Sequence, residues 1–266
     1  MTGNGTRILL AGGLLLAMSS GAMALPDCAG GVEIARARVI RVEQNGVLVL
    51  SDGRALLLEG IRLPMGAADH APPRLADEAR ATLLAAAREG TVTGAAVPPK
   101  QDRYDRVRVQ GFADGPNSSN KTWLQQTLLE QGLARVSLSP DRGECAADLF
   151  GFEAVARKAG RGLWAASAYR IRTDKDDWRT DTGTFQLIEG KVGRVSNRDG
   201  STVLDFGSDG RSGLLVNIAG SDRRALRQLD LDGLGGRRVR VRGIVQSVNG
   251  RPSIALSSPA QIEVLN

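Results

Sequence analysis

The sequence has few of the side chains on which most enzyme active sites depend. Among 266 residues there is one histidine, His70, and aromatic residues make up only 4%. A single imidazole excludes a histidine-rich metal centre, and no Gly-x-Ser-x-Gly turn is present to place a catalytic serine. His70 lies just before Pro72 and Pro73, where a solvated loop is expected. The sequence therefore does not indicate catalysis by a histidine-activated nucleophile.

Long apolar runs are also missing, apart from one near the N-terminus. This run extends from Ile8 to Met18. It has about 11 residues, whereas a bilayer-spanning helix needs about 20. Ala22 and Ala24 give the small-x-small pattern of a cleavage site. We therefore predict that residues 1–24 are a signal peptide, that the protein is periplasmic or extracellular, and that the mature chain has no transmembrane segment. An uncleaved N-terminal anchor is the alternative.

Cysteine is limited to two residues, Cys28 and Cys145. A structural zinc site takes four ligands, so this pair does not indicate one. In an oxidising compartment two isolated cysteines typically form a structural disulfide. We predict a Cys28–Cys145 disulfide that joins the N-terminal segment to the region before the last helix of the first domain.

The charge balance is mildly basic. The formal net charge is +6, from 35 Lys and Arg against 29 Asp and Glu. Removal of the signal peptide takes away only Arg7 and leaves +5. Such an excess is compatible with nucleic acid or another anion as a partner, but it does not select between them.

Turn and periodicity signals predict a first domain of short strands with accessory helices. Asn45-Gly46 and Asp52-Gly53 are hairpin signals and divide residues 33–63 into three strands. A strand pattern returns at 91–112 around a polar turn. Apolar residues at helical spacing predict helices at 73–88, 122–132 and 146–158.

A second strand-rich region follows a charged segment at 166–183, which is expected to be a linker. The predicted strands are 185–195, 202–206, 213–218, 237–248 and 254–265, with a helix at 222–229 after the third strand. This is the element order of an OB-fold, a five-stranded Greek-key barrel, and the first domain has the same order. We predict a mainly β, α+β protein with two tandem OB-like barrels, at 25–165 and 184–266.

Several motifs of the first domain resemble the thermonuclease (staphylococcal nuclease-like) family over about residues 36–164. The specific ones are Leu58-Glu-Gly-Ile-Arg-Leu-Pro64, Asp102-Arg-Tyr-Asp-Arg106, Leu128-Leu-Glu-Gln-Gly-Leu-Ala-Arg-Val136 and the 153–157 helix followed by Gly162-Leu-Trp164. Active members of that family are metal-dependent phosphodiesterases. They hold Ca²⁺ with carboxylates, activate water with a further carboxylate and neutralise the transition state with two arginines.

The resemblance implies a degenerate site in this chain. The family's metal-ligand positions fall on Gly46, Arg62 and Leu63, and the general-base position falls on Met65. The two arginine positions fall on Leu57 and Arg106, so only the second arginine is retained.

Glycine and methionine do not ligate Ca²⁺, and Arg62 places a fixed positive charge where the cation would lie. We therefore expect no cofactor and no metal-dependent hydrolysis. The alternative is an active Ca²⁺-dependent nuclease with displaced ligands, for which Glu43 and Asp52 flank the first turn.

Two groups of residues are candidates for binding. Arg238, Arg240 and Arg242 alternate with valines, which places three guanidinium groups on one face of a strand. With Arg237 and the segment containing Arg223, Arg224 and Arg227 they would form a basic groove, and a solvated strand face is the alternative.

Tyr104 and Arg106 are the second group, as a remnant base and phosphate contact. The alternative for this group is a turn in which Asp102 and Asp105 pair with Arg103 and Arg106. From both groups we predict a binding or scaffolding protein for nucleic acid or another anion, or for an envelope protein. The oligomeric state stays open.

Overall fold

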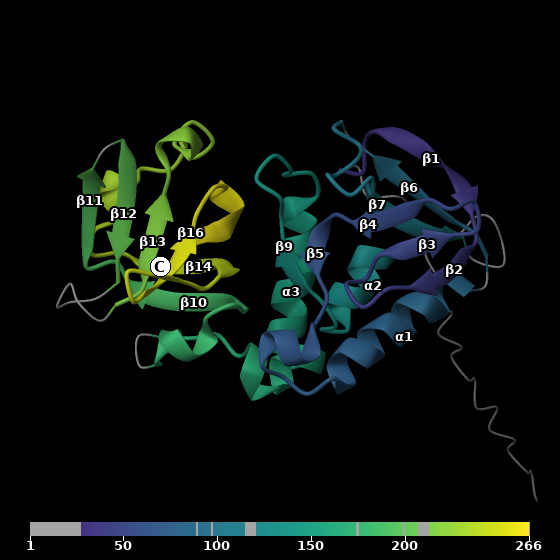
Figure 1. Cartoon of the computed structure of the whole chain (residues 1–266), viewed down its shortest axis with the longest axis horizontal. Coiled ribbons are helices and arrows are strands. Elements are labelled where there is room, and N and C mark those ends of the chain that lie inside the picture. The colour runs from purple at the N-terminus through teal and green to yellow at the C-terminus, as the bar shows by residue number, and fades with distance from the viewer. Residues whose placement is uncertain are drawn as a thin grey trace, which may run out of the picture.

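The computed structural model describes residues 28–88, 90–96, 98–114, 121–173, 176–198, 200–206 and 213–265. The expected signal peptide at 1–24 lies outside the described residues. Figure 1 shows two strand-rich modules side by side, with the three helices on the N-terminal one. No described helix is both long and apolar enough to cross a membrane.

The first module is built on a seven-stranded sheet. Its strands pair in the order β1-β6-β7-β4-β3-β2, with β8 added to β7, and a separate pair is formed by β5 and β9. The strands are β1 (Val32–Ala37), β2 (Val39–Val42), β3 (Leu48–Leu50), β4 (Ala55–Leu58), β5 (Gly60–Arg62), β6 (Val92–Ala96), β7 (Val107–Asp114), β8 (Lys121–Trp123) and β9 (Arg135–Ser137).

The hairpin turns lie where the sequence predicts them. Gly46, between β2 and β3, has φ +82°, and Gly53, between β3 and β4, has φ +88°. This left-handed backbone region is one that glycine enters without steric cost, so both turns use their glycine as expected. The short strands on either side supply Leu48, Leu50 and Leu56 to the core, each fully buried.

Three helices complete the first module, close to the predicted ranges. They are α1 (Arg74–Arg88), α2 (Leu124–Glu130) and α3 (Ala146–Lys158). On α1, Leu75, Ala79 and Leu83 recur every four residues and are buried, as the periodicity predicts. The Cys28–Cys145 disulfide is present directly before α3, which confirms that prediction.

The second module contains two sheets. Their orders are β10-β14-β17 and β11-β12-β13-β16-β15. The strands are β10 (Phe185–Lys191), β11 (Arg194–Arg198), β12 (Ser201–Asp205), β13 (Leu215–Ile218), β14 (Arg238–Ile244), β15 (Gln246–Val248), β16 (Arg251–Ala255) and β17 (Ile262–Leu265). The chain bends between β10 and β11 and between β14 and β15, so each of these pairs corresponds to one long strand that serves both sheets.

Both modules follow one pairing scheme, and this confirms the mainly β, α+β class. Each has a single parallel pair, β4–β7 in the first and β13–β16 in the second. The remaining pairs are antiparallel, as in a Greek-key meander. Among the described residues the strands of each module do not form a closed barrel. At some points around each module, neighbouring strands are linked by a bend of the chain and not by strand pairing.

The helix predicted at 222–229 is wrong. The segment forms consecutive turns between the 3₁₀ helices η5 (Gly220–Asp222) and η6 (Asp232–Leu234). Its backbone bonds are mostly of the i→i+3 type, from the Ala225 N–H to the Asp222 carbonyl and from the Leu229 N–H to the Leu226 carbonyl. Only Leu226 is fully buried here, so one anchor replaces the apolar face that a helix needs.

The connection between the modules packs at both ends. Tyr169, in η3 (Ser167–Tyr169), belongs to the core of the first module, and Trp178, in η4 (Trp178–Asp181), belongs to the core of the second. The predicted domain limits, 25–165 and 184–266, stay predictions.

Candidate functional site

The position of the family's second metal carboxylate holds a guanidinium that is already paired. Arg62 ends β5, and its Nη2 lies 3.9 Å from Oδ1 of Asp69 in η1 (Gly66–Asp69). The guanidinium carbon also lies 5.8 Å from the centre of the Phe185 ring, which begins β10 of the second module. The second module thus contacts the first at this position.

Asp69 is the centre of a buried network. Its Oδ2 accepts hydrogen bonds from the Met65 N–H at 2.8 Å, from Arg135 Nη2 at 3.1 Å and from the Tyr169 hydroxyl at 3.1 Å. Burial and the Asp69 charge raise the pKa of Tyr169 well above its ordinary 10.0, so the hydroxyl keeps its proton and donates. The Asp69 carboxylate therefore accepts its hydrogen bonds from groups of the protein itself.

Arg135 extends this network to the second module. Its side chain is 1% exposed, and it donates from Nη1 to the Phe185 carbonyl oxygen. The guanidinium carbon lies 4.7 Å from the Tyr169 ring centre and 5.1 Å from that of Phe185. Burial lowers the pKa of Arg135, and the Asp69 carboxylate opposes this effect.

The other two predicted metal-ligand positions, Gly46 and Leu63, have no side-chain oxygen. A Cβ added at Gly46 would lie 2.8 Å from Cδ2 of Leu63, so the buried leucine side chain fills the space beside the β2–β3 turn. The flanking carboxylates have arginine partners: Glu43 with Arg41 at 3.3 Å and Asp52 with Arg54 at 2.8 Å.

These residues do not fit a calcium ion. Ca²⁺ requires six to eight oxygen ligands with compensating negative charge. The positions that the resemblance assigns to the metal ligands and the base carry the side chains of Arg62, Leu63, Gly46 and Met65. In the part of the chain that the structure describes, no cluster of three or more His, Cys, Asp or Glu side chains is suited to a metal.

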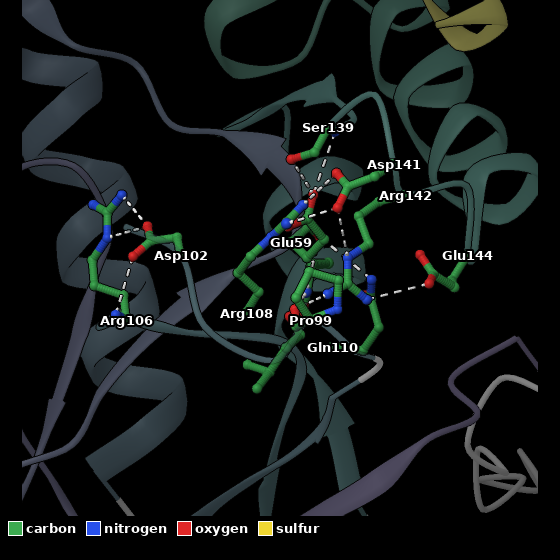
Figure 2. A network of polar contacts seen from close by, with 12 residues as sticks. Glu59, Pro99, Asp102, Arg106, Arg108, Gln110, Ser139, Asp141, Arg142 and Glu144 are labelled. Carbon is green, nitrogen blue, oxygen red and sulfur yellow. Dashed lines mark hydrogen bonds and ion pairs between the residues drawn. The ribbon is translucent and has the colours of Figure 1, made fainter. Parts of the chain in front are cut away.

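The retained family arginine is held in a tight turn. Asp102 Oδ1 accepts from the backbone N–H of Tyr104 and of Arg106, and its Oδ2 accepts from Arg106 Nε at 2.7 Å (Figure 2). Tyr104 is 61% exposed, with the Arg103 and Arg106 guanidinium carbons 4.8 and 5.0 Å from its ring centre. Asp105, at φ +58°, forms no ion pair with a described residue. The ion pair that builds the turn is therefore Asp102–Arg106.

A second arginine, Arg108, lies on β7, the strand that pairs with β4. Leu57 of β4, the position of the missing arginine, is in parallel register with Arg108 of β7. Arg106 itself lies in the turn before β7, so strand alternation does not relate its side chain to that of Arg108. Sequence reasoning missed Arg108, because no sequence pattern places it beside Leu57.

Arg108 is neutralised by two carboxylates. Its Nε donates to Glu59 Oε2 at 2.7 Å, and its Nη1 and Nη2 donate to Asp141 at 3.2 Å (Figure 2). Burial lowers the pKa of Arg108, but the hydrogen bonds to Glu59 and Asp141 outweigh it and raise the pKa above its ordinary value. The same bonds hold the pKa of Asp141 below its ordinary 3.8.

The space around this cluster is small. Glu59 also accepts from the Ser139 hydroxyl at 2.8 Å, and Arg142 reaches across to the Pro99 carbonyl and to Glu144. The cavity beside Glu59 and Arg108 measures about 10 Å³, which is about the volume one water needs. This face of the first module is therefore filled by its own ion pairs.

The arginines of β14 lie on one face, as predicted, but they do not line an open groove. Arg242 is 2% exposed, and Arg240 pairs with Glu189 at 2.6 Å and with Glu263 at 2.8 Å. Only Arg238 is substantially exposed, and its Nη2 lies 3.8 Å from Glu189. The expected basic groove is wrong for this strand, because carboxylates of β10, β17 and α3 lie opposite the arginines.

Arg242 links the two modules. It donates to the Val136 carbonyl at 3.0 Å and to Glu153 Oε2 of α3 at 3.0 Å, and it lies 4.6 Å from the Phe150 ring centre. Figure 1 shows α3 and β9 on the side of the first module that faces the second. Sequence patterns give no sign of this contact, because Arg242 and Glu153 are 89 positions apart.

The other sequence candidates have simpler surroundings. His70 is exposed in a left-handed turn at φ +54°, as expected for a solvated loop residue. Arg223, Arg224 and Arg227 are exposed and form no ion pair with any described residue. Met65 contributes its backbone N–H to Asp69.

Comparison with known proteins agrees with the geometry of the first module. Residues 56–166 match the family model described as Staphylococcal nuclease homologue. A search of curated proteins finds no significant match to the chain. The matched stretch includes β4, β5, the Asp102–Arg106 turn and α3, and it ends before the second module. This protein therefore contains a staphylococcal nuclease-like domain at residues 56–166.

Proposed function

We propose that this chain is an exported nuclease-fold protein that binds an anionic polymer and does not hydrolyse phosphodiesters with a bound calcium ion. Nucleic acid is the leading ligand. The observation that carries the proposal is the Arg62 guanidinium at the metal-carboxylate position, paired with Asp69 and in contact with Phe185. A cation at that position would face a fixed positive charge and no free carboxylate.

The first experiment separates binding from hydrolysis. The signal-free protein is incubated with DNA and RNA in Ca²⁺ and then in EDTA, and its melting temperature is followed as Ca²⁺ is added. We expect no cleavage and no thermal shift, whereas calcium at about 100 times its dissociation constant would stabilise a binding protein by about 2.7 kcal/mol. Calcium-dependent cleavage that EDTA abolishes and that survives repurification would establish a nuclease with displaced ligands instead.

The binding half of the proposal has its own measurement. Binding of labelled DNA and RNA is titrated at about 50 and 200 mM salt, because phosphate contacts make affinity fall steeply with salt. We expect salt-sensitive binding. Its complete absence would reject nucleic acid as the ligand.

A protein partner is the second candidate. Ile244, Val248 and Val264, on β14, β15 and β17 of the second module, are large apolar side chains with 39–45% of their surface exposed. Exposed apolar groups of this kind occur at protein interfaces, though singly they are also common on free surfaces. Retention of a specific envelope protein that is lost on changing these three residues to serine, with no nucleic-acid binding, would favour this function.

A further inference from the structure

Three exposed arginines of the second module have no acidic partner among the described residues. Arg223, Arg224 and Arg227 lie in the turns between β13 and β14, and none is ion-paired with a described residue. Asp222 and Asp230 are their acidic neighbours in sequence, and the Asp230 carboxylate accepts from the Gly233 N–H. Three guanidinium groups without an acidic partner among the described residues therefore lie within five positions of one another.

Two of these arginines line an open groove. Its walls are Ser221, Arg224, Ala225, Arg227, Gln228 and Pro259, and its volume is about 630 Å³. A hydroxyl and an amide beside two guanidinium groups are the donors that proteins use for phosphate oxygens. The groove is open to solvent, which suits an extended polymer better than an enclosed small molecule.

The groove continues across the module junction. A second groove, of about 500 Å³, shares Ala225 and Pro259 with the first and extends to Pro140, Ala146 and Phe150 of the first module. Its lining is largely apolar, and its one exposed acid, Asp141, is hydrogen-bonded to Arg108. The continuous groove therefore has a cationic end and an apolar end.

We propose that this junction groove binds single-stranded nucleic acid, with backbone phosphates at Arg224 and Arg227 and bases against the apolar wall near Phe150. This rests on the proposed function and gives it a location. A single strand presents charged phosphates and flat apolar bases together, whereas a duplex hides its bases. Arginine forms paired hydrogen bonds to phosphate and keeps its charge at any working pH.

The test uses a labelled oligothymidylate of about 12 nucleotides, within the site size of a domain of this kind. The signal-free chain is compared with the Arg224→Gln/Arg227→Gln variant. The matched control is Arg38→Gln/Arg74→Gln, because these exposed arginines also form no ion pair with a described residue and lie on the first module. We expect about tenfold weaker binding for the groove variant and a salt slope smaller by about 1.4, from two lost phosphate contacts. The control keeps the original slope.

A second pair of variants tests the course of the groove. Ala225 is exposed and belongs to both grooves, whereas Ala147 is exposed on α3 and lines neither. Ala225→Glu places a carboxylate in the path of the strand and should weaken binding about tenfold, because it repels phosphate at close range. Ala147→Glu makes the same charge change at a residue that lines neither groove and should weaken binding less than Ala225→Glu does.

The outcomes are distinguishable. If the unmodified chain binds no oligonucleotide at either salt concentration, the proposed function fails and this site fails with it. If it binds and the groove variants bind equally well, nucleic-acid binding stands and the junction groove is the wrong site. Equal weakening of the groove and control variants would mean that net charge acts without a site. Arginine-dependent binding to phosphatidylglycerol vesicles without oligonucleotide binding would replace nucleic acid by a lipid surface.

Discussion

The two modules share a strand-pairing scheme but differ in the arginines of one surface each. In the first module the face around β4 and β7 is closed by the Glu59–Arg108–Asp141 and Asp102–Arg106 pairs. In the second, Arg224 and Arg227 line an open groove without an acidic partner among the described residues. The module that matches a nuclease family is thus the one in which the arginines of this face are ion-paired. Family resemblance and available charge lie in different parts of the same chain.

Removal of the disulfide should destabilise the protein more than any other change proposed. It should act on the first module alone, because the bond lies wholly within that module. Cys28 and Cys145 are 117 positions apart, and in the chain-entropy model a loop of that size contributes about 5 kcal/mol. We expect the Cys28→Ser/Cys145→Ser variant to unfold at much lower denaturant. Fluorescence of a Trp178→Phe background reports the first module through Trp123 and Trp164. An unchanged midpoint would contradict the prediction.

Removal of Arg135 should have the second largest effect, because this residue lies where the two modules meet. Arg135→Ala leaves Asp69 buried with only the more distant Arg62 guanidinium beside it. Removal of one partner of a buried ion pair typically costs about 3–5 kcal/mol. Urea unfolding with a reporter in each module measures the loss and shows whether one transition becomes two. As a control, Arg135→Met with Asp69→Leu removes both charges and should cost less than Arg135→Ala. A loss below about 1 kcal/mol for Arg135→Ala would show that the pair is not coupled to folding.

An intermediate effect is expected from giving the first module free arginines. Asp102→Asn/Asp141→Asn removes carboxylate partners of Arg106 and Arg108 while Glu59 stays in place. Two fewer negative charges on this face should increase oligonucleotide affinity severalfold at about 50 mM salt and steepen the salt slope. Asp77→Asn/Glu78→Asn, on the exposed surface of α1, is the charge-matched control. An equal increase in oligonucleotide affinity in both variants would show that the position of the removed charges on this face does not matter.

The smallest effect concerns pH and the connection between the modules. Hydrogen bonds from Arg170 lower the pKa of Asp176 from 3.8 to about 2. A depressed carboxyl pKa stabilises the folded state above the unfolded value, and this stability is lost as pH falls from about 3.8 through about 2. Between neutral pH and about pH 2, the unfolding free energy of Asp176→Asn should therefore fall by less than that of the unmodified protein. An equal fall in both proteins, measured by urea unfolding at each pH, would contradict this prediction.

Local features of the fold could be predicted from sequence because their causes are local. Asn45-Gly46 and Asp52-Gly53 form the expected turns, and the apolar spacing of α1 corresponds to its buried face. The segment 222–229 is the exception, because one buried leucine anchors turns where the charge and apolar pattern suggests a helix.

Site features depended on distant partners and could not be predicted in the same way. Alternation placed Arg238, Arg240 and Arg242 on one face, but the strand register that sets Glu189 and Glu263 opposite Arg240 is not visible in the sequence. The contact of Glu153 with Arg242 depends on how the modules dock. Arg135 and Asp69 are 66 positions apart, and no sequence pattern marks them as partners. The absence of carboxylates at positions 62 and 65 could be read from the sequence, whereas the buried network around Asp69 could not.

The disulfide has a further consequence for how the protein responds to proteases. Because Cys28 and Cys145 are bonded, a single backbone cut between them leaves two pieces that stay covalently joined. Such a nicked molecule keeps both of its fragments at the same local concentration, so the broken strands can pair again without diffusing apart. Residues 28–145 therefore form a closed ring of chain with α3 and the second module attached after it. One cut inside the ring releases no fragment, whereas one cut after Cys145 does.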